Sequence, residues 1–181
     1  MNRRQFSKLL GLLSAGSMLF PAFTVNAKQY LTLEQAKQLL WGDSTLTKRV
    51  LELTEEQVKT IQNRSGTRVR NTTLQTWQVE GGGWFIVDQI IGKHENIDIA
   101  FSYQQDGTFK DFEIITYRET YGYEVANPKW KKQFHGMDFH QHLKLDDQII
   151  NISGATLSCK HITDGINRLN HTWNIVLKDL G

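Results

Sequence analysis

The chain contains very little cysteine, since Cys159 is the only one in 181 residues. A lone cysteine cannot form an internal disulfide, so no disulfide framework stabilises the fold. The sequence also lacks the Cys-x-x-Cys-His motif, which excludes an attached c-type haem as an electron carrier. We expect Cys159 to be a small buried residue within a helix.

Two catalytic signatures are missing as well. No Gly-x-Ser-x-Gly elbow surrounds Ser153 or Ser158, so neither serine is a recognisable hydrolytic nucleophile. The triplet Gly81-Gly82-Gly83 is not followed by lysine and a helix, as a phosphate-binding loop requires. We therefore expect the triplet to form a turn or a close backbone approach.

Histidines are grouped in one region without completing a metal site. His140-x-His142 would place two ligands on one face of a strand, and His135 and Asp138 are close in sequence. A metal site needs a third convergent ligand and a fixed second shell, which the sequence does not provide. Solvated or capping roles are expected for these histidines, and no metal is predicted.

The protein has no strong net charge once its first 27 residues are set aside. The whole chain has a formal net charge of +2, but residues 1–27 contain three basic and no acidic residues, so their removal leaves −1. A near-neutral domain has no electrostatic footprint for nucleic acid, so no nucleic-acid partner is predicted. The remaining chain of about 150 residues is long enough for one domain with its own core.

Residues 1–27 have the pattern of an export signal. An apolar run with Gly and Ser extends over residues 9–23, and Val25-Asn26-Ala27 places small residues where a signal peptidase reads. The run is shorter than the roughly 20 residues of a stable bilayer span, so no stable membrane anchor is expected after cleavage. Arg3-Arg4-x-Phe6 resembles a twin-arginine signal, which predicts a periplasmic protein. An ordinary secretory signal and an uncleaved anchor are the alternatives.

Residues 28–67 predict a helical lead-in. Thr32-Leu33-Glu34-Gln35 and Thr54-Glu55-Glu56-Gln57 both have the spacing of a capping box. The first helix is expected to end near Gly42 and the second at Gly66. The apolar residues expected to face inward are Leu33, Ala36, Leu39 and Leu40 in the first helix, and Val58 and Ile61 in the second.

From residue 68 onward the apolar pattern changes to a period of two, which predicts strands. An extended stretch over residues 74–79 is followed by strands over 84–91, 97–103 and 109–117. Gly81-Gly82-Gly83 and Gln105-Asp106-Gly107 supply turns between them. Short turns between consecutive strands indicate an antiparallel sheet.

A long amphipathic helix is predicted after Ser153-Gly154-Ala155-Thr156-Leu157-Ser158. Its apolar stripe consists of Leu157, Ile162, Ile166, Leu169, Trp173, Val176, Leu177 and Leu180. His161 and His171 lie off this stripe and are expected to be exposed. The fold class is therefore α+β: one domain with an antiparallel sheet, a helical N-terminal extension and a long C-terminal helix. The hydroxyls around the helix start suit either simple N-capping or a bound phosphate.

The stretch Ser153–Ser158 resembles the flavinylation motif of the FMN-binding domain family. That family includes the flavin-carrying subunits of sodium-translocating quinone reductase and of the related electron-transport complex. In it, FMN is joined through its phosphate to the threonine that closes Ser/Thr-Gly-Ala-Thr, which is Thr156 here. The resemblance implies a covalent FMN phosphoester on Thr156. The residues implied to surround it are Ser153, Gly154, Ala155, Leu157 and Ser158.

A second part of the resemblance lies upstream. The segment Arg118–Tyr123 leads to Trp130-Lys131-Lys132-Gln133-Phe134-His135-Gly136, and the resemblance covers roughly residues 80–178. It implies that residues 68–181 are an FMN-binding domain, in which the loop after the last strand contacts the flavin. The implied cofactor-binding residues of this loop are Glu119, Thr120, Tyr121, Gly122 and Tyr123. Trp130 and Phe134 are expected to pack a short helix instead.

Together with the predicted export signal, the resemblance implies an exported flavoprotein that transfers electrons between redox partners. An electron-transfer protein is expected rather than a stand-alone enzyme. The implied partners are an FMN transferase for maturation and a cytochrome or membrane reductase for electron exchange. Two alternatives stay open: the flavin subunit of an extracytoplasmic reductase complex, and a flavin-free exported binding module whose motif only caps a helix.

Overall fold

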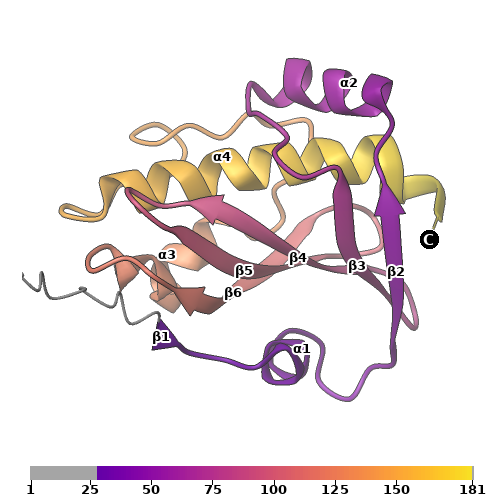
Figure 1. Cartoon of the computed structure of the whole chain (residues 1–181), viewed down its shortest axis with the longest axis horizontal. Coiled ribbons are helices and arrows are strands. Elements are labelled where there is room, and N and C mark those ends of the chain that lie inside the picture. Colours follow the sequence, from indigo (N-terminus) through magenta and orange to yellow (C-terminus); the bar gives the residue numbers. More distant parts are fainter. Residues whose placement is uncertain (1–27, 181) are drawn as a thin grey trace, which may run out of the picture.

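The computed structural model describes residues 28–180, and its centre is a six-stranded antiparallel sheet (Figure 1). The strands are β1 (Lys28–Gln29), β2 (Leu46–Glu52), β3 (Thr73–Val79), β4 (Trp84–Ile91), β5 (Asn96–Tyr103) and β6 (Phe109–Tyr117). Their order across the sheet is β1-β6-β5-β4-β3-β2, so β2 to β6 form a meander and β1 adds to the edge beside β6. The α+β class and the antiparallel sheet are confirmed, with β4 and β6 at their predicted bounds.

The long helix α4 (Thr156–Thr172) lies across one face of this sheet (Figure 1). It continues as a π-helical turn, η3 (Trp173–Leu177), and a short 3₁₀ turn, η4 (Lys178–Leu180). Within the described residues, only the two ends of its predicted apolar stripe are largely exposed: Leu157 is 43% and Leu180 50% exposed.

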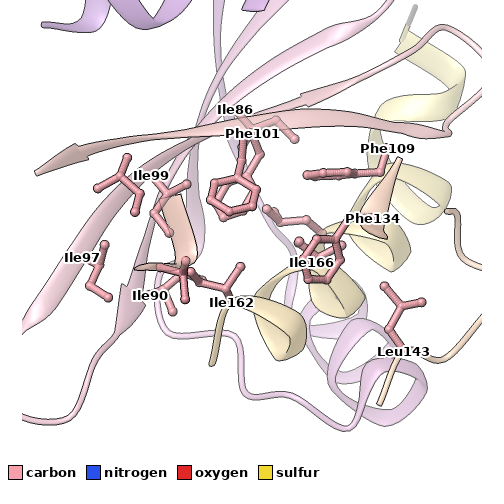
Figure 2. Close-up of a cluster of buried hydrophobic side chains, with 14 of the residues drawn as sticks. Ile86, Ile90, Ile97, Ile99, Phe101, Phe109, Phe134, Leu143, Ile162 and Ile166 are labelled. Atoms are coloured by element: carbon pink, nitrogen blue, oxygen red, sulfur yellow. The ribbon is translucent and has the colours of Figure 1, made fainter. Parts of the chain in front are cut away.

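The main core lies between α4 and the sheet. Figure 2 shows Ile86 and Ile90 of β4 and Phe101 of β5 gathered against Ile162 and Ile166 of α4, and all five are buried. Full burial of such a side chain stabilises the fold by about 1.5–3 kcal/mol. The packing of α4 on the sheet therefore fixes where the start of the helix lies.

The opposite face of the sheet is partly covered by α1 (Leu33–Trp41). Ala36 and Leu40 of α1 pack with Trp77, Phe85 and Ala100 in a second buried cluster. Leu39, which was predicted to share this side, is instead 62% exposed. The prediction for Leu39 is wrong because the buried stripe of this short helix is narrower than its apolar composition indicates.

Both predicted N-terminal helices form with their capping boxes. Thr32 caps α1 and Thr54 caps α2 (Glu55–Ser65), each with a reciprocal bond from the glutamine three residues later. The helices end at Gly42 and Gly66, as predicted. Helix α2 packs against α4 on the side away from the sheet (Figure 1).

The segment over residues 28–67 is not only helical. Between α1 and α2 the chain forms β2, which pairs along its whole length with β3 from Leu46↔Val79 to Glu52↔Thr73. The short β1 pairs with β6 at the other edge. The lead-in therefore supplies both edges of the sheet and belongs to the same layer as the strands that follow.

The segment between β6 and α4 contains three short helical pieces and a long connection. The 3₁₀ turn η1 (Tyr123–Ala126) is followed by α3 (Pro128–Lys131) and a second 3₁₀ turn, η2 (Lys132–Phe134). Trp130 and Phe134 are buried against each other and the sheet, which confirms their predicted packing role.

The predicted export signal, residues 1–27, lies outside the described residues, so its assignment stays a prediction. None of the helices formed by residues 28–180 has the length and apolar character needed to span a bilayer.

Candidate functional site

Three segments that are far apart in sequence meet around a cleft of about 400 Å³. They are the turn between β4 and β5, the loop after β6 and the first turn of α4. The residues that line the cleft are Lys93, His94, Glu119, Thr120, Tyr121, Gly154, Ala155, Thr156, Leu157 and Ser158. This volume falls within the range of small-molecule sites, roughly 300–1,000 Å³.

The first turn of α4 reaches the cleft without a side-chain cap. Ala155 occupies the N-cap position, and no side-chain hydrogen bond caps the helix. Thr156 is the first helical residue; it is exposed on the cleft, and its Oγ1 accepts a bond from Asn151 Nδ2 at 3.2 Å. The hydroxyls around the helix start therefore do not act as simple N-caps in the structure. Open N–H groups and the helix dipole favour an anion at this position.

A buried hydroxyl network joins the loop after β6 to α4. Tyr117 Oη donates to the carbonyl of Tyr121 at 2.6 Å and lies 3.0 Å from Ser158 Oγ. Because the single phenolic proton is used on the carbonyl, Ser158 is the donor to Tyr117. Burial raises the pKa of Tyr117 to about 12, so this phenol stays protonated as a donor.

Gly122 allows the close approach that this network requires. It has a φ of +94°, and a Cβ atom there would lie 2.5 Å from Ser158 Oγ and 2.7 Å from Tyr117 Oη. No side chain fits in this space. Gly122 therefore lies behind the wall of the cleft and sets the distance between the loop and α4.

Glu119 positions the turn between β4 and β5. Its Oε1 accepts bonds from the backbone N–H groups of His94 and Glu95, the latter at 2.9 Å. Burial alone would raise the pKa of Glu119, but these backbone donors hold the pKa below its usual value, so the carboxylate stays charged. Its bonds thus go to the protein backbone, and they place Lys93 and His94 at the edge of the cleft.

The cleft combines charged and apolar surfaces. Lys93 and His94 are exposed at one side, while Tyr121 is 81% and Leu157 43% exposed. Exposed aromatic and aliphatic surface in a cleft provides contact area for a flat ring. The arrangement can hold an elongated ligand with an anionic end at the helix start and an apolar body against Tyr121 and Leu157.

The structure brings together eight of the eleven residues that the sequence predicted as cofactor-binding. Ser153 is exposed next to the cleft without lining it, and Gly122 lies behind its wall. Tyr123 does not reach the cleft, because its ring stacks on Tyr30 with centroids 4.2 Å apart. The ring contact expected of Tyr123 is therefore replaced by packing on the N-terminal segment.

Other titratable residues lie away from the cleft. Asp138 accepts a bond from the backbone N–H of His140 and lies 3.0 Å from its Nδ1, a local contact in a turn. His161 and His171 are half-buried, so their predicted exposure is wrong; α2 and the loop after it cover this side of α4. Residues 28–180 contain no group of three His, Cys, Asp or Glu placed to hold a metal.

Cys159 is confirmed as a buried residue of α4. Burial raises the pKa of its thiol. A protonated, buried thiol is a poor nucleophile, so its role is packing.

The fold and the cleft together define an α+β protein with a ligand cleft at the start of its longest helix. Residues 92–170 match the family model of the FMN-binding domain. The matched region runs from the β4–β5 turn through β5, β6 and the loop to α4, and it contains every residue that lines the cleft. No curated protein shows a significant match to the chain. The match supports a flavin-binding protein and FMN as its cofactor.

Proposed function

We propose that this protein carries FMN covalently on Thr156 and transfers electrons outside the cytoplasm. The observation that carries the proposal is the position of the Thr156 hydroxyl. It is exposed on a cleft of about 400 Å³, at the first residue of a helix whose N-terminus has no side-chain cap.

The chain offers suitable groups for the phosphate of FMN. A phosphoester on Thr156 would lie beside the open N–H groups of the first turn of α4, where the helix dipole favours negative charge. Lys93 adds a cation to the lining of the same cleft. To form the phosphoester, the Thr156 hydroxyl oxygen would displace a nucleoside monophosphate from the FMN phosphorus of a dinucleotide flavin donor, breaking the diphosphate P–O bond and releasing the hydroxyl proton. An FMN transferase is the implied partner for this step.

Tyr121 and Leu157 are the residues that would contact the isoalloxazine ring. Both are largely exposed on the cleft, and their burial under a ring would remove apolar surface from water. FMN, when bound, supplies the one- and two-electron chemistry, while the protein anchors it and controls solvent access. No side chain needs to act as an acid or base on a substrate, and a cytochrome or membrane reductase would complete the electron path.

The decisive experiment is the intact mass of the protein purified from a host with an active FMN transferase. One FMN joined with loss of water adds roughly 440 Da, located by peptide mapping on the peptide that contains Thr156. Thr156→Val should remove the added mass. Thr120→Val is the matched control, because Thr120 lines the same cleft and should keep the modification. An unmodified wild-type protein, or a modified Thr156→Val variant, would contradict the proposal.

A further inference from the structure

A second cavity, of about 260 Å³, lies further along α4. It is bounded by the middle of α4, the end of β4 and the loop that joins α2 to β3. No residue lines both this cavity and the flavin cleft. It is therefore a separate concave site, and the proposed flavin attachment gives it no role.

The cavity holds more positive than negative charge. The charged residues that line it are Arg68, Arg70, Lys160 and Arg168, with Asp88 and Asp164. Arg168 is buried and forms an ion pair with Asp88, and Lys160 pairs with Asp164 at 2.6 Å. These two pairs use both carboxylates.

Among residues 28–180, Arg68 and Arg70 have no partner of opposite charge. Both are exposed, and no ion pair or hydrogen bond joins either side chain to another residue of the described part of the chain. They lie two residues apart on the loop at the rim, so two guanidinium groups face the cavity region without a carboxylate to neutralise them. The net charge of the cavity lining, with His161 neutral, is about +2.

Part of the cavity wall is apolar. Ile90 and Ile91 line it, and Ile90 packs directly on the backbone of Gly165 in α4. A ligand that fits both parts carries negative charge at the rim and an aliphatic body inside. The volume lies just below the usual range of drug-sized pockets, which restricts the ligand to a small molecule.

We propose that this cavity binds a small organic anion with two negative charges, held by Arg68 and Arg70. Guanidinium groups bind carboxylates and phosphates in a bidentate manner, and the chemistry required of the ligand is the doubly charged oxyanion. A short dicarboxylate and a small phosphomonoester both supply it. The site does not depend on flavin attachment to Thr156.

Isothermal titration calorimetry on the purified protein tests the proposal with two probes, succinate and inorganic phosphate. At low ionic strength at least one of them should bind, and succinamide, which has the same length as succinate but no charge, should not. Tighter binding of succinate indicates a dicarboxylate site, and tighter binding of phosphate indicates a phosphomonoester site. Higher salt should weaken either interaction, because exposed charges are screened.

Variants at the rim identify the binding residues. Arg68→Gln and Arg70→Gln should each weaken binding by about tenfold, and the double variant should abolish it. Arg64→Gln is the matched control, because Arg64 is exposed in the last turn of α2 and does not line the cavity. Because both rim arginines are exposed and unpaired, these substitutions should leave the urea unfolding midpoint unchanged.

The proposal would be overturned by no binding of either anion, by equal binding of succinamide, or by undiminished binding to the double variant. Thr156→Val should bind the anion with wild-type affinity. This separates the anion site from the proposed function, since loss of flavin leaves the cavity intact. Loss of anion binding in Thr156→Val would show that the flavin holds the anion, and would also overturn the proposal.

Discussion

At the scale of single residues, Gly122 is under a constraint that its neighbours impose. Its φ is positive, and a Cβ atom would enter the space of Ser158 and Tyr117. Gly122→Ala should therefore lower the free energy of unfolding by about 2–4 kcal/mol, from backbone strain and overpacking together. Urea unfolding followed by circular dichroism measures this loss.

Gly136→Ala provides the control for the backbone part of that effect. Gly136 also has a positive φ, +75°, but a Cβ atom there would meet no atom within 4 Å. Gly136→Ala should therefore lower the free energy of unfolding by only about 1–2 kcal/mol. Equal losses in the two variants would show that the contact with Ser158 does not matter.

Tyr117 makes stability depend on pH in the alkaline range. Burial raises its pKa from 10.0 to about 12, so the folded protein holds this proton more tightly than the unfolded chain does. Stability from this residue is fully present below pH 10 and is lost as the pH rises through about 12. Urea unfolding at pH 9 and at higher pH should show a smaller alkaline loss for Tyr117→Phe than for the wild type. An identical loss in both proteins would contradict the assignment.

The residues of the site were predicted unevenly, for a physical reason. Thr156 and its neighbours were found because a short motif precedes an amphipathic helix. Lys93 and His94 were missed, because they lie in a polar turn with no pattern of its own. Their position depends on Glu119, whose side chain accepts hydrogen bonds from backbone N–H groups 25 and 24 residues earlier in the chain. A contact between residues so far apart leaves no pattern in the local sequence.

At the scale of elements, α4 holds the connection that precedes it through buried asparagines. Asn167 Nδ2 donates to the carbonyl of Leu143 at 2.8 Å, and its Oδ1 accepts from the N–H of Leu143 at 2.9 Å. Asn170 similarly accepts from Tyr103 Oη and donates to the carbonyl of Asp138. These bonds fix the connection that leads into Ser153 and Thr156.

Asn167→Ala should lower the free energy of unfolding by about 2–4 kcal/mol, because it leaves two buried backbone groups of Leu143 unpaired. Chemical denaturation measures the change. Asn174→Ala is the control, since Asn174 lies in η3, is half-buried, and makes no side-chain hydrogen bond within the described residues. A loss in Asn167→Ala no greater than that in the control would show that the connection is held by other contacts.

The strands differ in how well the sequence could predict them. β4 and β6 lie inside the sheet. Their apolar residues either alternate with polar ones or follow one another in a run, so the bounds of both strands were predicted correctly. β2 was missed because it is an edge strand whose middle residues Thr47, Lys48, Arg49 and Val50 are all exposed. An exposed edge strand needs no buried face along most of its length, and charged residues there also discourage pairing with other chains.

At the scale of the whole molecule, the predicted route of export can be tested by charge-conserving substitution. Replacing both Arg3 and Arg4 with lysine keeps the basic character that an ordinary secretory signal uses, but removes the arginine pair. The double variant should accumulate in the cytoplasm, as measured by cell fractionation and immunoblotting. Arg49→Lys with Arg64→Lys makes the same chemical change at two exposed positions and should be exported normally. Normal export of the Arg3 and Arg4 variant would favour the general secretory route.

The meander has a consequence for the family match. The matched region begins at residue 92, yet β5 hydrogen-bonds along its whole length to β4, which ends at Ile91. It stops at residue 170, before Trp173 and Leu177 complete the core. The region that carries the cleft therefore cannot be excised as a module. If this region were moved into another protein, β5 would lack its hydrogen-bonding partner β4 and the hydrophobic core would be incomplete. Any transfer of the flavin-binding region must therefore include the preceding strands of the sheet.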